Sequence, residues 1–478
     1  YIILNSLMHE TIYISERGFN NVECINFVDF MTEKVNQLGN SITGAFKSLK
    51  NKFKLFMFPE LKEQLIDTNI IEVKSKTKKA FCDFVEEEAA QRETESPEYV
   101  SLRSEPTALM STAQLATLHG KRVESHVVLT KDGYLLTLHR LRNSFEEGNK
   151  IGNFTVLLHH GLLGSSADWI LLGPENSLPY ILSSGGCDVW LANARGNYYS
   201  RGHVSSNVDS LEFWDFSFHE MGQFDLPAVV EYIKKVKNSD EKINFIGHSM
   251  GATAFLVMLS TYPDYNKYFR IAIFLAPLAY MSNAGGPLKI LTQMAKSPPE
   301  QLLKLLGEGE FVPNRKIPIW IANKYCSGPD MYCVNPLLFL SGSIPEEHKW
   351  NKSLLARILY HIPAGGSTKT ILHFAQMVNS EKFHKYNHED EEYPLRLVTV
   401  PIVMFSSNGD LIATISDVLR LYFSISSPID HYVIRDKNLS HVDFLWNPHA
   451  KVLVYEKVID FLSNGLNLNA SRANEIMW

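Results

Sequence analysis

The sequence predicts an α/β fold with a mostly parallel sheet, on two observations. From about residue 125 onward, short apolar runs alternate with longer segments of helical periodicity, which is the pattern of βαβ units. Several runs, such as TVLLHH and IAIFLAP, are almost wholly apolar, as in strands buried on both faces. The predicted strands are 125–130, 135–141, 154–160, 188–193, 243–248, 271–276, 402–406 and 431–435. Helical patterns lie between them, among them 219–237, 250–261 and 448–463.

The first 105 residues follow a different pattern. Apolar residues from Phe27 to Phe56 recur every three or four positions, which predicts one amphipathic helix. Its lysines fall mainly off the apolar stripe, so the helix has two interpretations. It either contacts a membrane surface or packs on neighbouring helices. Glu86 to Pro106 is charged and poor in apolar residues, which is typical of a linker. We therefore expect an N-terminal helical extension with a charged linker over 1–105.

The α/β alternation stops between 278 and 395. This stretch is helical in pattern and is broken by Pro and Gly, so it predicts an insertion between two strands of the sheet. In open α/β sheets ligands bind at the carboxyl edge, and the insertion is expected to form a helical cap or lid there. The sheet domain then comprises two parts, 106–277 and 396–478.

Bulk composition narrows the function classes. The chain has 478 residues, of which 45% are hydrophobic, which is ample for a packed core. A net charge of −6 with dispersed Lys and Arg argues against nucleic-acid binding, which needs a concentrated basic surface. No apolar run reaches the ~18 residues that span a bilayer. YIILNSLMHETIYI lacks a basic flank and is not interpreted as a signal peptide. No Cys/His pairs have the spacing of a zinc site, so neither a metal nor a cofactor is expected.

A serine lies between two glycines in GHSMG, which is Gly247, His248, Ser249, Met250 and Gly251. A predicted strand precedes this pentapeptide and a predicted helix follows it, which is the context of a nucleophile elbow. The two glycines relieve crowding where such a turn strains the backbone. We expect Ser249 to be a nucleophile, and a helix-capping serine is the alternative.

A serine nucleophile needs a base and a group that orients the base. In folds with this elbow the acid and then the histidine follow the serine along the chain. Asp410 comes in the turn after the strand in PIVMFSSNGDLIA, where it is held firmly enough to orient an imidazole. The rival acids are Asp417 in a helical run, Asp430 immediately before the next strand, and Asp443. His441, in the loop between the last strand and the last helix, is the expected base.

Two backbone N–H groups are expected to form the oxyanion hole. One belongs to Met250, which follows the nucleophile, and the other to Leu162, in the loop after the third strand. His160, in the same loop, is interpreted as a residue that holds the shape of the loop. His431 is interpreted as structural, and His449 as a surface or capping residue.

Nine stretches in order from about 108 to 465 resemble the acid lipases, the family of gastric lipase and lysosomal acid lipase. They include TKDGYLLTLHRL, LLHHGLLGSSADWI, DVWLANARGN, EFWDFSFHEMGQFDLPAVVEYI, GHSMG, HIPAGGSTKTILHFAQMVNSEKF and SHVDFLW. The resemblance implies an α/β-hydrolase fold with an eight-stranded, mostly parallel sheet and a helical cap. It implies hydrolysis of triacylglycerols or cholesteryl esters at a lipid–water interface, in a secreted or lysosomal setting. It also implies Ser249, Asp410 and His441 as catalytic residues, with Leu162 and Met250 as oxyanion donors.

Two cysteines, Cys326 and Cys333, are seven residues apart in a loop-like stretch, which favours a disulfide over two free thiols. They also match the position of a disulfide common in the acid lipases, although they are closer together than in the mammalian members. Four N-x-S/T sequons provide glycosylation candidates at Asn153, Asn351, Asn438 and Asn469.

The chemical identity of the ester stays open at this level. Leu- and Phe-rich cap segments such as LLKLLGEGEF suit a fatty acyl chain, but they equally suit packing of the cap. A shorter-chain carboxylesterase is one alternative to a lipase. A catalytically silent lipid-binding protein on the same fold is a second alternative, and it predicts the loss of a catalytic residue.

Overall fold

The computed structural model describes residues 110–142, 151–285, 308–311 and 352–464, and its centre is a nine-stranded mixed sheet. The strands are β1 (Arg122–Leu129), β2 (Tyr134–Arg142), β3 (Thr155–His159), β4 (Asp188–Ala192), β5 (Gly202–His203), β6 (Ile243–His248), β7 (Phe269–Leu275), β12 (Ile402–Ser407) and β13 (Pro428–Ile434). The predicted N-terminal extension, the Cys326–Cys333 pair and the sequons at Asn351 and Asn469 lie outside the described residues.

The order of the strands across the sheet is β1-β2-β4-β3-β6-β7-β12-β13, and β5 pairs with β2. In this order the strands from β4 to β13 run parallel to one another, whereas β2 is antiparallel to β1, β4 and β5. All eight predicted strands are present, and the prediction of a mostly parallel sheet is confirmed. The ninth strand, β5, was not predicted because two residues carry no periodic signal.

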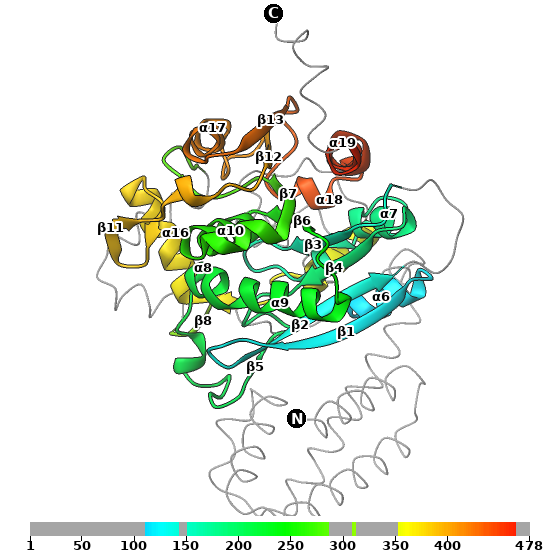
Figure 1. The fold of residues 1–478 in the computed structure, drawn as a ribbon, viewed down its shortest axis with the longest axis horizontal. Helices are drawn as coiled ribbons and strands as arrows, with labels where there is room; N and C mark the ends of the chain where they lie inside the picture. Colours follow the sequence, from blue (N-terminus) through cyan, green and yellow to red (C-terminus); the bar gives the residue numbers. More distant parts are fainter. Residues whose placement is uncertain (1–109, 143–150, 286–307, 312–351, 465–478) are drawn as a thin grey trace, which may run out of the picture. The chain divides into compact units, whose positions relative to one another are not determined.

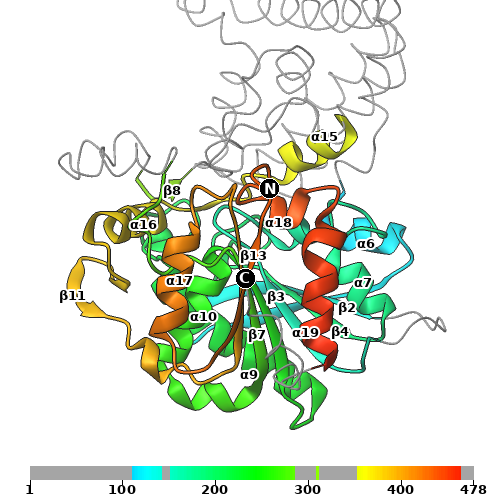
Figure 2. The same cartoon turned by 90° about the horizontal axis from the view of Figure 1, so that it is seen from above.

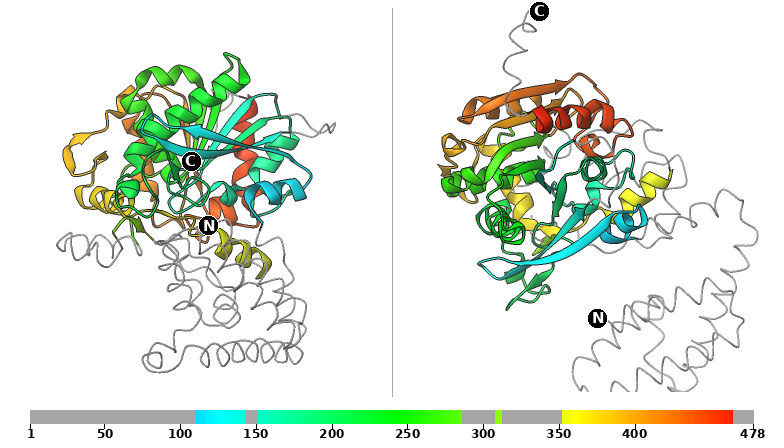
Figure 3. Two further views of the ribbon diagram at one scale, coloured as in Figure 1. Left: turned by 90° about the horizontal axis from the view of Figure 1, so that it is seen from below. Right: turned by 45° about the vertical axis from the view of Figure 1, so that its right-hand side comes forward.

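Helices cover both faces of the sheet (Figures 1 and 2). On one face lie α8 (Phe218–Glu220), α9 (Leu226–Lys237), α10 (Met250–Thr261) and α17 (Ile415–Ser424), and on the other lie α6 (Thr112–Leu118), α7 (Leu178–Ser184) and α19 (Glu456–Asn464). In Figure 3 the green helices and the red α19 again lie on opposite sides of the strands. This two-sided cover explains why the central strands are apolar at nearly every position.

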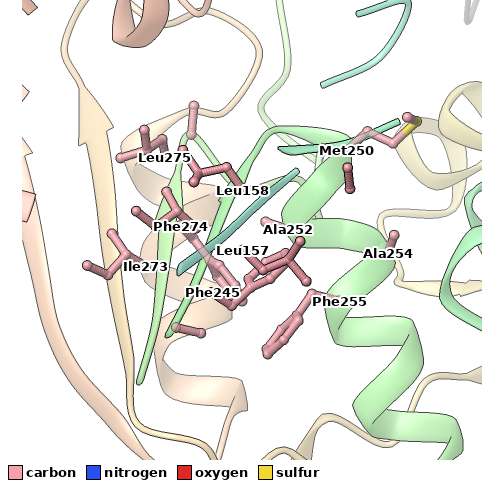
Figure 4. Close-up of a cluster of buried hydrophobic side chains, with 14 of the residues drawn as sticks. Leu157, Leu158, Phe245, Met250, Ala252, Ala254, Phe255, Ile273, Phe274 and Leu275 are labelled. Carbon is pink, nitrogen blue, oxygen red and sulfur yellow. The ribbon is translucent and has the colours of Figure 1, made fainter. Parts of the chain in front are cut away.

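A cluster of buried aromatic side chains joins β6 to α10. Phe245 on β6 stacks on Phe255 of α10, with ring centroids 4.1 Å apart and an interplanar angle of 14° (Figure 4). Phe274 of β7 meets both rings edge-on, and Leu157 of β3 is fully buried in the same cluster. These contacts fix strand and helix to each other on either side of the turn that joins them, so the turn itself has little freedom.

Between β7 and β12 the structure describes β8 (Glu310–Phe311), α15 (Lys352–His361), β9 (Gly366–Ser367), α16 (Thr368–Ser380), β10 (His384–Lys385) and β11 (His388–Glu392). β8 pairs with β9, and Glu310 forms an ion pair with Arg201, 2.6 Å long, beside β5. The boundaries of the predicted cap stay a prediction. Among the described residues, no helix is long and apolar enough to cross a membrane.

Candidate active site

Ser249 is the single residue between the end of β6 and the start of α10. Its backbone has φ 53° and ψ −118°, a conformation that residues other than Gly rarely adopt. Its N–H donates to the carbonyl of Leu275 on the neighbouring strand β7, 3.0 Å away. This backbone conformation places the side chain of Ser249 at the carboxyl edge of the sheet. The predicted strand–turn–helix geometry is therefore present.

The glycines of GHSMG are required by close backbone contacts. A Cβ on Gly251 would lie 2.5 Å from the carbonyl oxygen of His159, and one on Gly247 would lie 2.7 Å from the backbone nitrogen of Ala252. Both distances are shorter than real Cβ contacts. α10 can therefore start against the ends of β6 and β3 only if these positions carry no side chain.

Three side chains from separate segments form a line of hydrogen bonds. The Oγ of Ser249 lies 2.8 Å from Nε2 of His441, and Nδ1 of His441 lies 2.8 Å from Oδ2 of Asp410. The other carboxylate oxygen of Asp410 accepts from the backbone N–H groups of Ile412 and Ala413, at 2.8 and 2.9 Å. All three side chains are buried. The carboxylate is thus fixed from behind, and it holds Nδ1–H so that Nε2 faces the serine.

The rival acids are engaged elsewhere. Asp417 lies in the first turn of α17, where it accepts from Asn283 and Thr414, and Asp430 lies within β13. Asp443 accepts from the backbone N–H of Ser440 at 2.6 Å and so shapes the loop that carries His441. Only Asp410, among the described carboxylates, contacts the His441 ring.

The two predicted oxyanion donors flank the serine. Met250 is the first residue of α10, and Leu162 lies in the turn after β3. Among the described residues, neither N–H donates to a protein acceptor. Gly164 N–H donates to the carbonyl of Gly161 at 3.2 Å and closes this turn, and Leu163 within it has φ 57°. A Cβ on Gly161 would lie 3.1 Å from the Cβ of Ser249, so the turn approaches the elbow directly.

His160 holds the same turn and does not contact the serine. One ring nitrogen, Nδ1, donates to the carbonyl of Gly161 at 2.8 Å, and Nε2 accepts from the N–H of Ala194 and from Asn197 at 3.0 and 3.1 Å. Burial and the neighbouring His159 keep the pKa of His160 well below its usual value, so the ring stays neutral. The structural interpretation of His160 fits this geometry. Nε2 of His431 on β13 forms a hydrogen bond 2.7 Å long with Oγ of Ser406 on the neighbouring strand β12.

A pocket opens above Ser249 and His441. Its polar lining comes from His248, Ser249, His441 and Asp168. Most of the remaining wall is apolar and includes Leu278, Met281, Ile362, Ile371, Phe374 and Leu445. Such a pocket suits a hydrocarbon chain next to one reacting polar group. No cluster of His, Cys, Asp or Glu able to hold a metal occurs in the described part of the chain.

Comparisons with known proteins agree with the fold and indicate the family. A family model described as the alpha/beta hydrolase fold matches residues 155–448, and one described as a partial alpha/beta-hydrolase lipase region matches 112–173. The chain is 33% identical to Lipase 3 of Drosophila melanogaster over 355 residues, which cover 71% of this chain and 89% of that protein. It is 34% identical to gastric triacylglycerol lipase of Rattus norvegicus, over 75% of this chain and 93% of the relative. It is 31% identical to lipase member M of Homo sapiens, over 81% of this chain and 94% of the relative.

The chain belongs to the acid lipase family of the α/β hydrolases. It is accordingly a carboxylic ester hydrolase by family, and the predicted α/β-hydrolase fold is confirmed. The exposed side chains of Asn153 and Asn438 are accessible for modification, and their glycosylation stays a prediction.

Two pocket residues of this lipase were not recognised as functional from the sequence. His248, predicted only as part of the elbow, lies 2.9 Å from the carbonyl of His441 through Nε2, and burial lowers its pKa to about 3. Asp168 is only 4% exposed, and burial raises its pKa to about 8. The available signal for Asp168 was an acidic residue inside the apolar run SSADWILL, because buried carboxyls without a partner are rare.

Proposed function

We propose that this protein hydrolyses neutral lipid esters, triacylglycerols or cholesteryl esters, through an acyl-enzyme at Ser249. The observation that carries the proposal is the pair of 2.8 Å hydrogen bonds that join Ser249, His441 and Asp410 beneath an apolar pocket. The names of its relatives, gastric triacylglycerol lipase among them, support the same substrate class. A polar or charged substrate would gain little from the apolar wall.

In the proposed reaction Ser249 Oγ attacks the ester carbonyl while Nε2 of His441 takes the hydroxyl proton. The N–H groups of Leu162 and Met250 stabilise the oxyanion of the tetrahedral intermediate. His441 then delivers its proton to the departing alcohol, which leaves the acyl group on Ser249. A water molecule, deprotonated by His441, attacks this acyl-enzyme, and the carboxylic acid departs as the proton returns to Ser249. Asp410 orients the imidazole and stabilises its charged form throughout.

The substrate is proposed to reach the site from a lipid–water interface, and the enzyme is proposed to be secreted or lysosomal. The exposed sequon residues Asn153 and Asn438 support such a setting. Contact of the N-terminal amphipathic helix with a membrane surface stays part of the proposal. Deleting residues 1–105 and measuring binding to liposomes tests that contact, and unchanged binding excludes it.

A fluorophosphonate probe tests the nucleophile. The wild type is expected to be labelled and Ser249→Ala is expected to lose the label. A wild type that resists the probe indicates a silent lipid-binding protein. Hydrolysis of triolein, cholesteryl oleate and p-nitrophenyl esters of graded length, between pH 4 and 8, tests the substrate class. The proposal requires a preference for long, water-insoluble esters, and a preference for butyrate identifies a shorter-chain carboxylesterase.

A further inference from the structure

Asp168 is a buried carboxyl group in the wall of the active-site pocket. It lies in the 3₁₀ helix Ser166–Trp169, directly after the turn that carries Leu162. Its Oδ2 lies against Gly164, where an added Cβ would be 2.1 Å away. Its backbone carbonyl accepts from Nε1 of Trp446, another pocket residue, at 3.2 Å. The carboxyl group therefore lies directly against the turn that carries Leu162.

Asp168 forms no ion pair among the described residues, so none of their cations compensates a charge on its carboxyl. In the same part of the chain, its Oδ1 has no hydrogen-bond partner. In the described part of the chain, the contacts that favour its carboxylate come from the backbone N–H groups of Ser165 and of Asp168 itself. An ionised carboxylate in such a place is strongly disfavoured, whereas a protonated one is tolerated.

The titratable groups around Asp168 do not change this. His248 and His441 share the pocket with it. Among the described elements, those that pack most extensively against its 3₁₀ helix are α15, with Arg357 and His361, and α18 (Asp443–Trp446), with Asp443. From β2, His139 contacts the neighbouring Ser166. None of these groups contributes a charge interaction at the Asp168 carboxyl, where burial dominates.

We propose that Asp168 is a positioning residue of the oxyanion turn that acts as a neutral carboxylic acid, so that its ionisation impairs the site at alkaline pH. This proposal rests on the proposed hydrolysis at Ser249. Two effects act together when the proton leaves. The new carboxylate lacks solvation and disturbs the Gly161–Gly164 turn that it contacts, and its negative charge opposes the oxyanion that forms in the same pocket.

The same ionisation links pH to stability. Burial raises the pKa of Asp168 to about 8 in the folded state, whereas the unfolded chain ionises near the ordinary value of an aspartate. The folded state therefore holds this proton between about pH 4 and pH 8, where the unfolded state has lost it. The contribution of Asp168 to stability is largest at acidic pH and declines as pH rises through that interval.

The test compares Asp168→Asn, which is neutral at every pH, with the wild type. We measure kcat/KM for p-nitrophenyl butyrate at pH 6.5 and pH 9, subtract spontaneous hydrolysis, and take the ratio within each protein. The wild type is expected to lose about tenfold at pH 9, and Asp168→Asn less than about threefold. The unfolding equilibrium constant should rise between pH 5 and pH 8 by about 500-fold more in the wild type than in the variant.

Asp417→Asn is the matched control, because it neutralises a buried carboxyl outside the pocket that is already paired with Asn283. It should keep the wild-type ratio between the two pH values. A folded Asp168→Asn with the wild-type ratio overturns the proposal. If the variant does not fold, the infrared band of a protonated carboxyl group in the wild type provides the test instead. That band should disappear between pH 6.5 and 9.5, and its absence at pH 6.5 also overturns the proposal.

The two proposals fail in different ways. If the wild type hydrolyses no ester and Ser249 takes no fluorophosphonate, the proposed function is wrong. If the wild type is active at pH 6.5 and its alkaline loss is the same with Asn at 168, only the role of Asp168 is wrong.

Discussion

Nε2 of His441 lies 2.8 Å from Oγ of Ser249, although 192 residues separate them in the chain. The contact exists because Ser249 directly follows β6 and His441 lies in the loop between β13 and α18, so both lie at the carboxyl edge of the parallel part of the sheet. His248 adds a second connection between the same segments, since its ring donates to the carbonyl of His441. The elbow and the loop that carries His441 are thus joined by one contact between side chains and one between a side chain and a backbone carbonyl.

Removing either partner of the serine should abolish most turnover without unfolding the protein. His441→Ala deletes the base, and Asp410→Asn lets the imidazole adopt the wrong tautomer. We expect kcat to fall by roughly 10³-fold or more in each case, with a much smaller change in KM. Steady-state kinetics on p-nitrophenyl butyrate measures the effect. Asp430→Asn is the control, because Asp430 is a rival acid within β13, whereas Asp410 contacts the imidazole directly. Near-normal turnover in Asp410→Asn refutes the assignment of Asp410.

Gly251→Ala should destabilise the fold and lower activity together. The added Cβ would meet the carbonyl oxygens of His159 and His160 at 2.5 and 2.9 Å, and a rigid backbone cannot yield as a side chain does. We expect a loss of about 1–3 kcal/mol in the free energy of unfolding, measured by urea denaturation. Gly285→Ala is the matched control, because its nearest neighbour, the carbonyl of Leu411, is 3.7 Å away. Equal stability of the two variants contradicts the crowding argument.

Arg195 should not tolerate Lys. Its buried guanidinium forms ion pairs with Asp132 and Asp225, both at 2.6 Å, and its charge lies 4.0 Å from the ring centroid of Tyr134. Lysine cannot donate to both carboxylates in this geometry, so one of them loses its compensation. We expect Arg195→Lys to lower the free energy of unfolding by about 3 kcal/mol.

Arg142→Lys provides the comparison for Arg195→Lys in the same denaturation experiment. Arg142 pairs with Glu124 at 3.4 Å, and its side chain is 46% exposed. Exposed pairs contribute about 0–1 kcal/mol, so this change should be nearly silent. If Arg195→Lys lowers the free energy of unfolding no more than Arg142→Lys does, the buried ion pairs of Arg195 are unimportant for stability.

Acid should destabilise the protein through buried neutral histidines. Burial lowers the pKa of His373 to about 3, while the unfolded chain takes up the proton near pH 6.5. The stabilising contribution of His373 is therefore complete above about pH 6.5 and declines as pH falls towards 3. His373→Gln should reduce the loss of stability between pH 7 and 4.5 by roughly 2 kcal/mol in urea denaturation. His388→Gln, at an exposed position on β11, should leave that loss intact. The proposal of a neutral buried His373 fails if the two variants behave alike.

The pocket wall should control the length of the ester. Ala375 on α16 lines the pocket with a small side chain, and phenylalanine there narrows the space available to substrate. We expect Ala375→Phe to lower kcat/KM for a palmitate ester at least about tenfold more than for a butyrate ester. Asn379→Phe, an exposed position on the same helix, should leave the ratio of the two esters unaltered. An equal decrease for both esters in Ala375→Phe assigns the effect to general damage.

The positions of the strands along the chain and of the elbow were predictable because their signals are local, whereas the order of the strands across the sheet came only from the structure. Fully apolar runs indicate buried parallel strands. Two glycines around a serine indicate a tight turn between β6 and α10, where there is no room for side chains. The short β5 escaped prediction because its pairing with β2 depends on a distant strand and not on its own two residues.

Sequence alone determined the class of the fold and the identity of Ser249, Asp410 and His441 as candidates, because spacing and chain order are properties of the chain itself. The tertiary structure decided which acid contacts the histidine, since Asp417, Asp430 and Asp443 differ from Asp410 only in where the folded backbone places them. It also decided that Asp168 and His248 line the pocket. Burial, which sets their pKa values, arises from contacts between segments far apart in the sequence.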